Sequence, residues 1–135
     1  MFDMLRTEKS NRAYNLGAAI FAFLLWGGWS FYINTQHGSL KNGLISGLGQ
    51  GVFSFVMTLF IVYLIEKQFH YFNHDYAKML LPPILTVCIS ASLLVLMHFI
   101  LGTPSILYTL FPVIIIAFLF ALITNTKLYL RYKAV

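Results

Sequence analysis

The residues with the clearest capacity for chemistry in this sequence are polar side chains set within apolar stretches. Gln50 and His98 lie in such stretches, and apart from Cys88, His98 is the only ionisable side chain well inside one of them. An amide or an imidazole in apolar surroundings needs a hydrogen-bonding partner, and it is a candidate for contact with a ligand. We favour an interhelical hydrogen bond for Gln50 and an interfacial or hydrogen-bonded position for His98, and contact with a ligand is the alternative for both.

A second group of residues has the spacing of metal ligands. Glu66, His70 and His74 recur every four residues, so an extended helix would place all three on one face. Imidazole and carboxylate groups arranged in this way can bind a transition metal. Such a pattern also arises readily by chance in an interfacial segment, so we predict no metal site and keep these residues as a weak candidate.

The residues expected of an enzyme do not occur in a suitable arrangement. Ser90, Ser92 and His98 have no accompanying carboxylate, and their helical phases differ. The glycine-rich stretch GLGQG lies within an apolar segment and is not followed by the Lys-Ser/Thr pair of a phosphate-binding loop. We therefore expect a protein that is not an enzyme and that has no cofactor.

The composition indicates the elements that must position these residues. Of 135 residues, 59% are hydrophobic and only 10% are charged, which is far from the composition of a soluble globular protein. A helix needs about 20 residues to cross a hydrocarbon core, and a lipid-exposed backbone must satisfy its own hydrogen bonds. We predict one all-α domain, an integral membrane four-helix bundle covering residues 1–135. Its spans are expected at about 14–34, 44–65, 79–101 and 105–124.

The basic residues predict the orientation. Eight of the nine Lys and Arg residues precede the first span, separate the second from the third, or follow the fourth, and only Lys41 lies on the other side. Cytoplasmic loops carry such an excess, so we expect two antiparallel transmembrane hairpins with both termini in the cytoplasm. The net charge of +5 matches anionic lipids at the cytoplasmic face and requires no nucleic acid. A bacterial cytoplasmic (inner) membrane is the expected location.

Prolines mark two further features. Pro82 and Pro83 are expected in the first turn of the third span, where a missing amide hydrogen matters least. Pro112 lies inside the fourth span, where we expect a kink and a freed carbonyl near Tyr108.

A stripe of small residues runs along the second span. Gly43, Gly47 and Gly51 recur every four residues, and Ser54 continues the same face. Small residues let helix backbones approach closely within a membrane. We therefore predict a packing seam, either within the chain or between subunits.

Polar and small residues also converge on the external ends of the predicted helices, whereas the cytoplasmic halves are apolar. We expect a shallow external pocket or partner groove here, although interfacial residues also cluster naturally at helix ends. The candidate pocket residues are Trp26, Trp29, Asn34, Gln50, His98 and Tyr108.

Two functional hypotheses follow. The first is a non-catalytic membrane subunit that associates with itself or with a larger complex through the glycine-rich second helix. The second is a small carrier or flippase for an amphiphilic or lipid-linked substrate. In length and number of spans alone, the chain resembles the small multidrug exporters and the flippases for lipid-linked sugars. Those exporters depend on a glutamate in their first membrane helix, and the first span here contains none.

Overall fold

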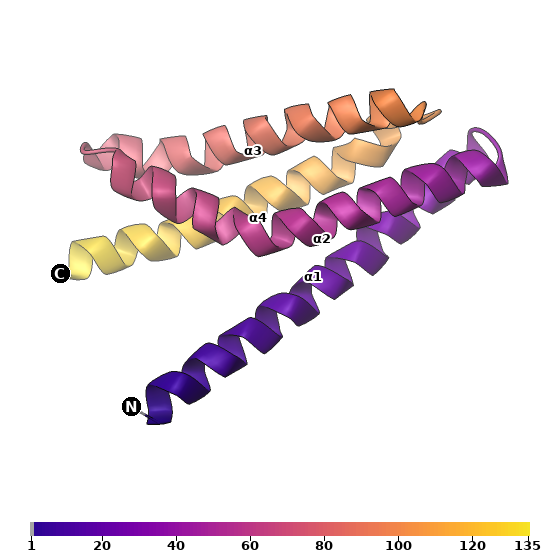
Figure 1. The fold of residues 1–135 in the computed structure, drawn as a ribbon. Coiled ribbons are helices and arrows are strands. Elements are labelled where there is room, and N and C mark those ends of the chain that lie inside the picture. Colours follow the sequence, from indigo (N-terminus) through magenta and orange to yellow (C-terminus); the bar gives the residue numbers. More distant parts are fainter. Residues whose placement is uncertain (1) are drawn as a thin grey trace.

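The computed structural model describes residues 2–135, with side chains from residue 12 onward. Within this range the chain forms only helices and their connections (Figure 1). All four helices are long and apolar enough to cross a membrane, which confirms the all-α class and the four apolar spans. The helices are α1 (Phe2–Gln36), α2 (Leu40–Tyr71), α3 (Asp75–Leu101) and α4 (Ile106–Ala134).

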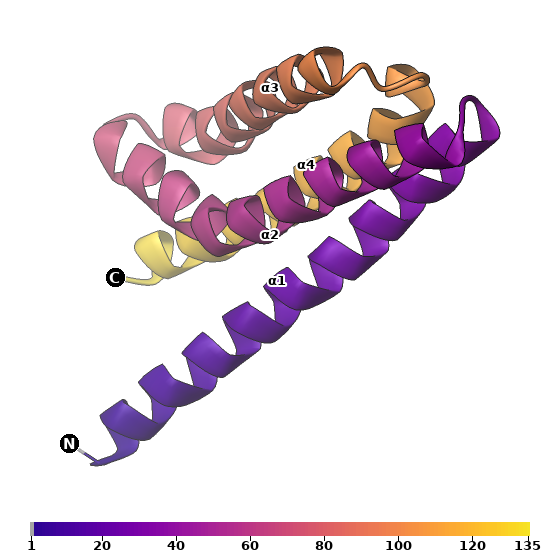
Figure 2. The ribbon, with the colours of Figure 1, turned by 45° about the vertical axis from the view of Figure 1, so that its right-hand side comes forward.

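The chain reverses direction at each connection (Figures 1 and 2). The connections 37–39 and 102–105 lie together at one end of the molecule, which we call the two-loop end. The connection 72–74 and both chain termini lie toward the other end, which we call the terminal end. Consecutive helices therefore run antiparallel.

Helices α2 and α4 each contact all three other helices, and the contacts of α2 are the more extensive. Helix α1 packs mainly along α2, touches α4 less extensively, and makes no contact with α3 among the described residues. Both ribbon views show α1 diverging from the other helices toward the terminal end (Figures 1 and 2). The bundle is therefore less tightly packed on the flank where α1 diverges.

The small-residue stripe of α2 forms its seam with α1 of the same chain. A Cβ atom added to Gly47 would lie 2.9 Å from Phe31 Cβ and 3.0 Å from the Gly27 carbonyl oxygen. A Cβ atom on Gly27 would lie 3.2 Å from Gly51 Cα. The two backbones approach closely because neither has side chains at the crossing. The sequence did not decide whether this seam lies within the chain or between subunits. The contacts of the described residues are those of a seam within the chain.

The prolines of α3 lie deeper in their helix than the sequence analysis placed them. Helix α3 begins at Asp75, so Pro82 and Pro83 are interior residues and not members of the first turn. Proline has no amide hydrogen, so the carbonyls four residues earlier lose their helical partners. Asn125 of α4 compensates by donating from Nδ2 to the Lys78 carbonyl at 2.9 Å and to the Met79 carbonyl at 2.8 Å. The side-chain amide of Asn125 thus satisfies both backbone carbonyls that the prolines leave without a helical partner.

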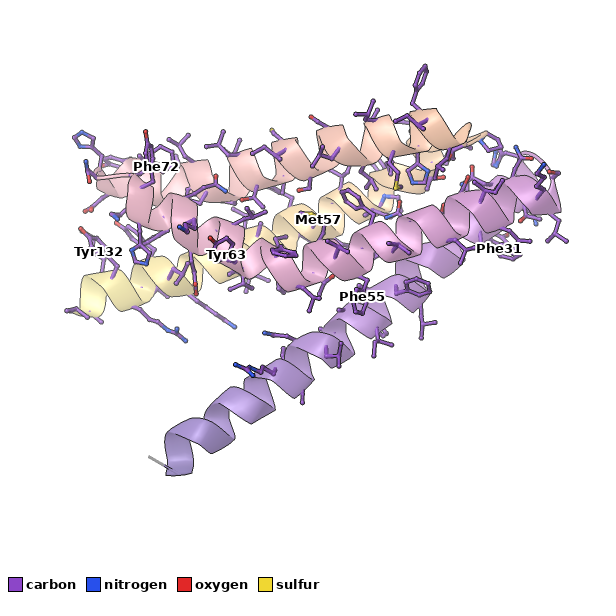
Figure 3. All side chains as sticks on the ribbon, in the orientation of Figure 1. Phe31, Phe55, Met57, Tyr63, Phe72 and Tyr132 are labelled. Carbon is purple, nitrogen blue, oxygen red and sulfur yellow. The ribbon has the colours of Figure 1, made fainter. Side chains whose placement is uncertain are left out.

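A buried lysine completes this end of the molecule. Lys78 Nζ donates to the Phe69 carbonyl at 2.8 Å and lies over the rings of Phe69 and Tyr132, at 4.6 and 5.0 Å from their centroids. Tyr132 marks this end of α4 in Figure 3. An exposed ion pair between Lys133 and Asp75 links α4 to the start of α3. Backbone, aromatic and ionic contacts therefore fasten α2, α3 and α4 together at the terminal end.

Candidate functional site

A cleft of about 280 Å³ lies at mid-depth among the four helices. Its walls are almost entirely apolar, and none of the described lining residues is charged. Alanines widen it on three helices, namely Ala22 on α1, Ala91 on α3 and Ala117 on α4. Small side chains leave space here because the backbone of α1 has already begun to diverge from its neighbours (Figure 2).

The cleft is half open, and its exposed lining residues indicate the direction of the opening. Phe21 on α1 is 65% exposed, and Ile116 and Phe120 on α4 are 49% and 45% exposed, although all three line the cleft. Helices α1 and α4 also share few contacts. The opening therefore lies between α1 and α4, on the flank that would face lipid in a membrane.

A buried polar network runs from the two-loop end to the cleft. His98 Nε2 lies 2.7 Å from Gln50 Oε1, and His98 Nδ1 lies 2.7 Å from Thr103 Oγ1. Ser46 Oγ lies 2.9 Å from Thr103 Oγ1, and Gln50 Nε2 donates to Ser54 Oγ at 2.9 Å. Ser54 is also a lining residue of the cleft. The network thus joins the α3–α4 connection to the cleft wall.

The orientation of the Gln50 side-chain amide, with Oε1 toward His98 and Nε2 toward Ser54, sets the direction of these hydrogen bonds. The carbonyl oxygen of Gln50 can only accept, so His98 Nε2 carries the hydrogen and the neutral ring accepts at Nδ1. Thr103 must then donate its hydroxyl hydrogen to His98, which leaves its oxygen to accept from Ser46. Each of these four hydrogen bonds therefore has its donor on the Ser46 side and its acceptor on the Ser54 side. Such aligned chains strengthen one another in apolar surroundings.

A second polar cluster ties α1 to the start of α4. Asn34 Nδ2 donates to Thr109 Oγ1 at 2.8 Å, and Asn34 Oδ1 accepts from the backbone amide of Ser105 at 3.0 Å. Trp29 Nε1 donates to the Thr109 carbonyl at 3.2 Å, one residue beyond the carbonyl near Tyr108 that was expected to need a partner. These bonds lie at the two-loop end, so they fasten α1 to α4 there and leave the flank open farther down.

The structure distributes the six candidate pocket residues over four places. Trp26 lines the cleft, Trp29 and Asn34 belong to the α1–α4 tether, and Gln50 and His98 bond to each other. Tyr108 is 63% exposed and stacks on His37. Asn34, Gln50 and His98 are each 0% exposed, so these three residues belong to closed networks and not to the wall of an open external pocket. Their amide, imidazole and hydroxyl partners satisfy them because the helices meet closely at this end.

The structure gives three residues roles that the sequence did not predict. Ser54 was predicted to serve packing alone, yet it accepts a hydrogen bond from Gln50. Ser54 follows Gln50 by four residues, and this spacing, which places both on one helical face, could have indicated the bond. Asn125 was overlooked because the prolines it serves were placed in a helix start. Thr103 lies in a connection and has no sequence pattern that points to His98.

The weak metal candidate does not assemble. Helix α2 ends at Tyr71, and His74 is the N-cap of α3, so the continuous helix that would align Glu66, His70 and His74 is interrupted. His70 makes an edge contact with the ring of Phe69. Among the described residues, no three His, Cys, Asp or Glu side chains gather as a metal-binding group.

Comparison with known proteins assigns no family. The sequence matches no protein-family model, no curated protein and no solved structure. The functional argument therefore starts from the cleft and the network above it.

Proposed function

We propose that this chain is a membrane carrier that holds the hydrocarbon part of an amphiphile in the mid-depth cleft. The observation that supports this most directly is an uncharged, apolar hollow that opens sideways between α1 and α4. A ligand can enter such a hollow from the bilayer without crossing water. The volume of about 280 Å³ lies near the lower end of the roughly 300–1,000 Å³ usual for small-molecule sites. Such a volume suits one hydrocarbon chain or one small ring system.

We further propose that the protein resides in a bacterial cytoplasmic membrane with the terminal end in the cytoplasm. Lys67 and Lys78 near the α2–α3 connection and Lys127, Arg131 and Lys133 of α4 support this orientation, since basic residues accumulate on the cytoplasmic side. The four helices then form two transmembrane hairpins whose short connections are external. The basic terminal end lies against anionic lipid headgroups.

Two adjacent positions of α3 provide a test of the carrier. Ala91 lines the cleft, whereas the neighbouring Ser92 is exposed and outside its lining. Ala91→Phe should fill the cleft and abolish retention of co-purified lipid in native mass spectrometry, and it should slow the movement of a fluorescent lipid across proteoliposomes. Ser92→Phe should leave both measurements at the wild-type level. Equal lipid retention and transport in the two variants would contradict the proposal.

A second candidate function is that of a non-catalytic subunit in a larger assembly. The diverging part of α1 favours it, because Phe21 and Leu24 are each 65% exposed on a helix whose described residues make no contact with α3. The glycines of α2 already face α1, so the assembly surface in this proposal is the outer face of α1. Native mass spectrometry from mild detergent should then show a dimer or larger species that Leu24→Lys dissociates. A monomer at all protein concentrations would eliminate self-association.

A further inference from the structure

We propose that the cleft selects a neutral lipid that carries a carbonyl oxygen, and that the hydroxyl of Ser54 donates a hydrogen bond to that oxygen. This inference rests on the proposed role of the cleft as an amphiphile site. It goes further by naming the polar group that the ligand must bring and the residue that recognises it.

The first step concerns the hydroxyl groups in the cleft wall. Three hydroxyl residues line the cleft, namely Ser54, Thr58 and Ser90. Thr58 donates its hydrogen to the Ser54 carbonyl at 2.7 Å, and Ser90 donates to the Thr86 carbonyl, so both use their hydrogens within their own helices. Ser54 donates to no described residue, although its oxygen accepts from Gln50. Ser54 alone among the three has a hydrogen to offer.

The second step concerns why Ser54 must act as a donor. It is only 6% exposed, and the hydrogen bonds from Ser46 through His98 and Gln50 all point toward it. Its oxygen is therefore already engaged as an acceptor, and the polarisation of the chain strengthens the hydroxyl as a donor. A buried donor without an acceptor is unfavourable, so an acceptor in the cleft would remove a penalty that the empty protein carries.

The third step concerns the charge and depth of the ligand group. No charged side chain from residue 12 onward lines the cleft, so a phosphate or carboxylate there would remain without compensation. Ser54 lies about 15 Å from either end of the predicted span 44–65, at a rise of about 1.5 Å per residue. Charged headgroups do not reach this depth. A carbonyl oxygen of an uncharged lipid is an acceptor that does.

Trp26 supports the same choice. It lines the cleft from α1, and its indole nitrogen, which can only donate, has no hydrogen-bond acceptor among the described residues. The spare polar hydrogens of the lining are therefore those of Trp26 and Ser54. Ser54 calls for an acceptor in the ligand, and Trp26 adds an aromatic face suited to a ring or a hydrocarbon chain.

The test compares pairs of ligands with the same number of carbon atoms, of which only one member carries carbonyl oxygen. Full-length protein in detergent is titrated with decylbenzoquinone against decylbenzene, and with methyl laurate against tridecane. Binding is followed by the fluorescence of Trp26 in a Trp29→Phe background. A hydrogen bond in a membrane protein is worth about 0.6 to 1.4 kcal/mol, so wild-type Ser54 should favour a carbonyl ligand about 3- to 10-fold. The pair that shows this preference distinguishes a quinone-type ring from an acyl ester.

Substitutions at the three hydroxyls locate the effect. Ser54→Ala should reduce the carbonyl preference to about 1-fold, whereas Thr58→Ala and Ser90→Ala should keep it. Because Ser54→Ala also removes the acceptor of Gln50, Ser54→Cys serves as a second variant that retains a weak acceptor and a poor donor. An infrared carbonyl band of the bound ligand should lie at lower frequency in the wild type than in either Ser54 variant.

The outcomes separate the two proposals. Binding of both members of a pair with equal affinity in the wild type overturns the carbonyl inference and leaves the amphiphile cleft in place. A preference that persists in Ser54→Ala and Ser54→Cys also overturns it. Failure of every probe to bind contradicts the proposed function itself.

Discussion

Helix α1 has two very different neighbours, and the contrast explains most of what is distinctive about this molecule. Against α2, Gly27 lies so close that its added Cβ would be 3.0 Å from the Gly47 carbonyl oxygen. Against α4, Ala22 and Ala117 face a cleft of about 280 Å³. Small residues occur in both regions, yet one is a tight seam and the other is a hollow.

The difference arises from where polar bonds hold the backbones. Asn34 and Trp29 bind α1 to α4 only at the two-loop end, and the glycines hold α1 to α2 over the same part of the helix. Beyond that point α1 diverges, as both ribbon views show (Figures 1 and 2). Small residues therefore close an interface where the helices meet, and they enlarge a cavity where the helices separate.

The largest effect should come from a bulky residue in the seam. Gly47→Leu would drive its side chain into Phe31 and the Gly27 carbonyl, so we expect the free energy of unfolding to fall by about 3 kcal/mol or more. Reversible unfolding in mixed micelles measures the change. Gly28→Leu is the control, since nothing lies within 4 Å of a Cβ added there. Equal losses in the two variants would show that the seam is not tightly packed.

A smaller loss is expected when the α1–α4 tether is removed. Asn34→Ala leaves the Ser105 amide without its partner and deletes the bond to Thr109, which should lower the free energy of unfolding by about 1–2 kcal/mol. Asn73→Ala, in the exposed α2–α3 connection, should change it little. The same unfolding assay compares the two variants, and an Asn34→Ala protein as stable as Asn73→Ala would mean that α2 alone positions α1.

Adjacent glycines should give changes of opposite sign. Gly27→Ala places a methyl group 3.0 Å from the Gly47 carbonyl oxygen and should destabilise the protein by about 1 kcal/mol. Gly28→Ala meets no neighbour within 4 Å and should stabilise its helix by about 0.5–1 kcal/mol, because alanine has the higher helix propensity. Thermal denaturation of both variants tests the sign, and a gain in both would contradict the close crossing.

The smallest effect is expected in the cleft. Ala117→Leu extends into open space, so its free energy of unfolding should stay within about 0.5 kcal/mol of the wild type. One turn later, Ala121 is 0% exposed in the core with Ile61 and Val87, and Ala121→Leu should cost about 1–3 kcal/mol. Similar losses at the two positions would indicate that the cleft is filled in solution.

The sequence predicted those features that depend on one helix at a time. Long apolar stretches predicted the four helices, and the four-residue spacing of Gly43, Gly47 and Gly51 predicted a packing face. The need of Gln50 for a partner was also recognisable, because an amide so deep in an apolar span is unfavourable alone. The hydrogen bond between Gln50 and His98 confirms that expectation.

The remaining features depend on how helices meet, which periodicity does not specify. The cleft requires the divergence of α1 together with small residues on three helices, and no single stretch of sequence carries that information. Ser54 and Gly51 have the same small-residue character in sequence, but only the structure shows that Ser54 ends a hydrogen-bonded chain. Because α3 begins at Asp75, Pro82 and Pro83 lie inside the helix, and Asn125 donates to the carbonyls that they leave unpaired. Helix boundaries are the least certain part of a sequence prediction, so the sequence did not reveal this role.

The hydrogen bonds from Asn125 to the Lys78 and Met79 carbonyls have a consequence for biosynthesis. The third segment emerges from the ribosome with two carbonyl groups that its own backbone cannot satisfy, and the amide that satisfies them is translated more than forty residues later. Release of α3 alone into lipid would therefore be unfavourable. The last two segments should leave the translocon as a pair, so that nascent chains truncated before Asn125 remain held there.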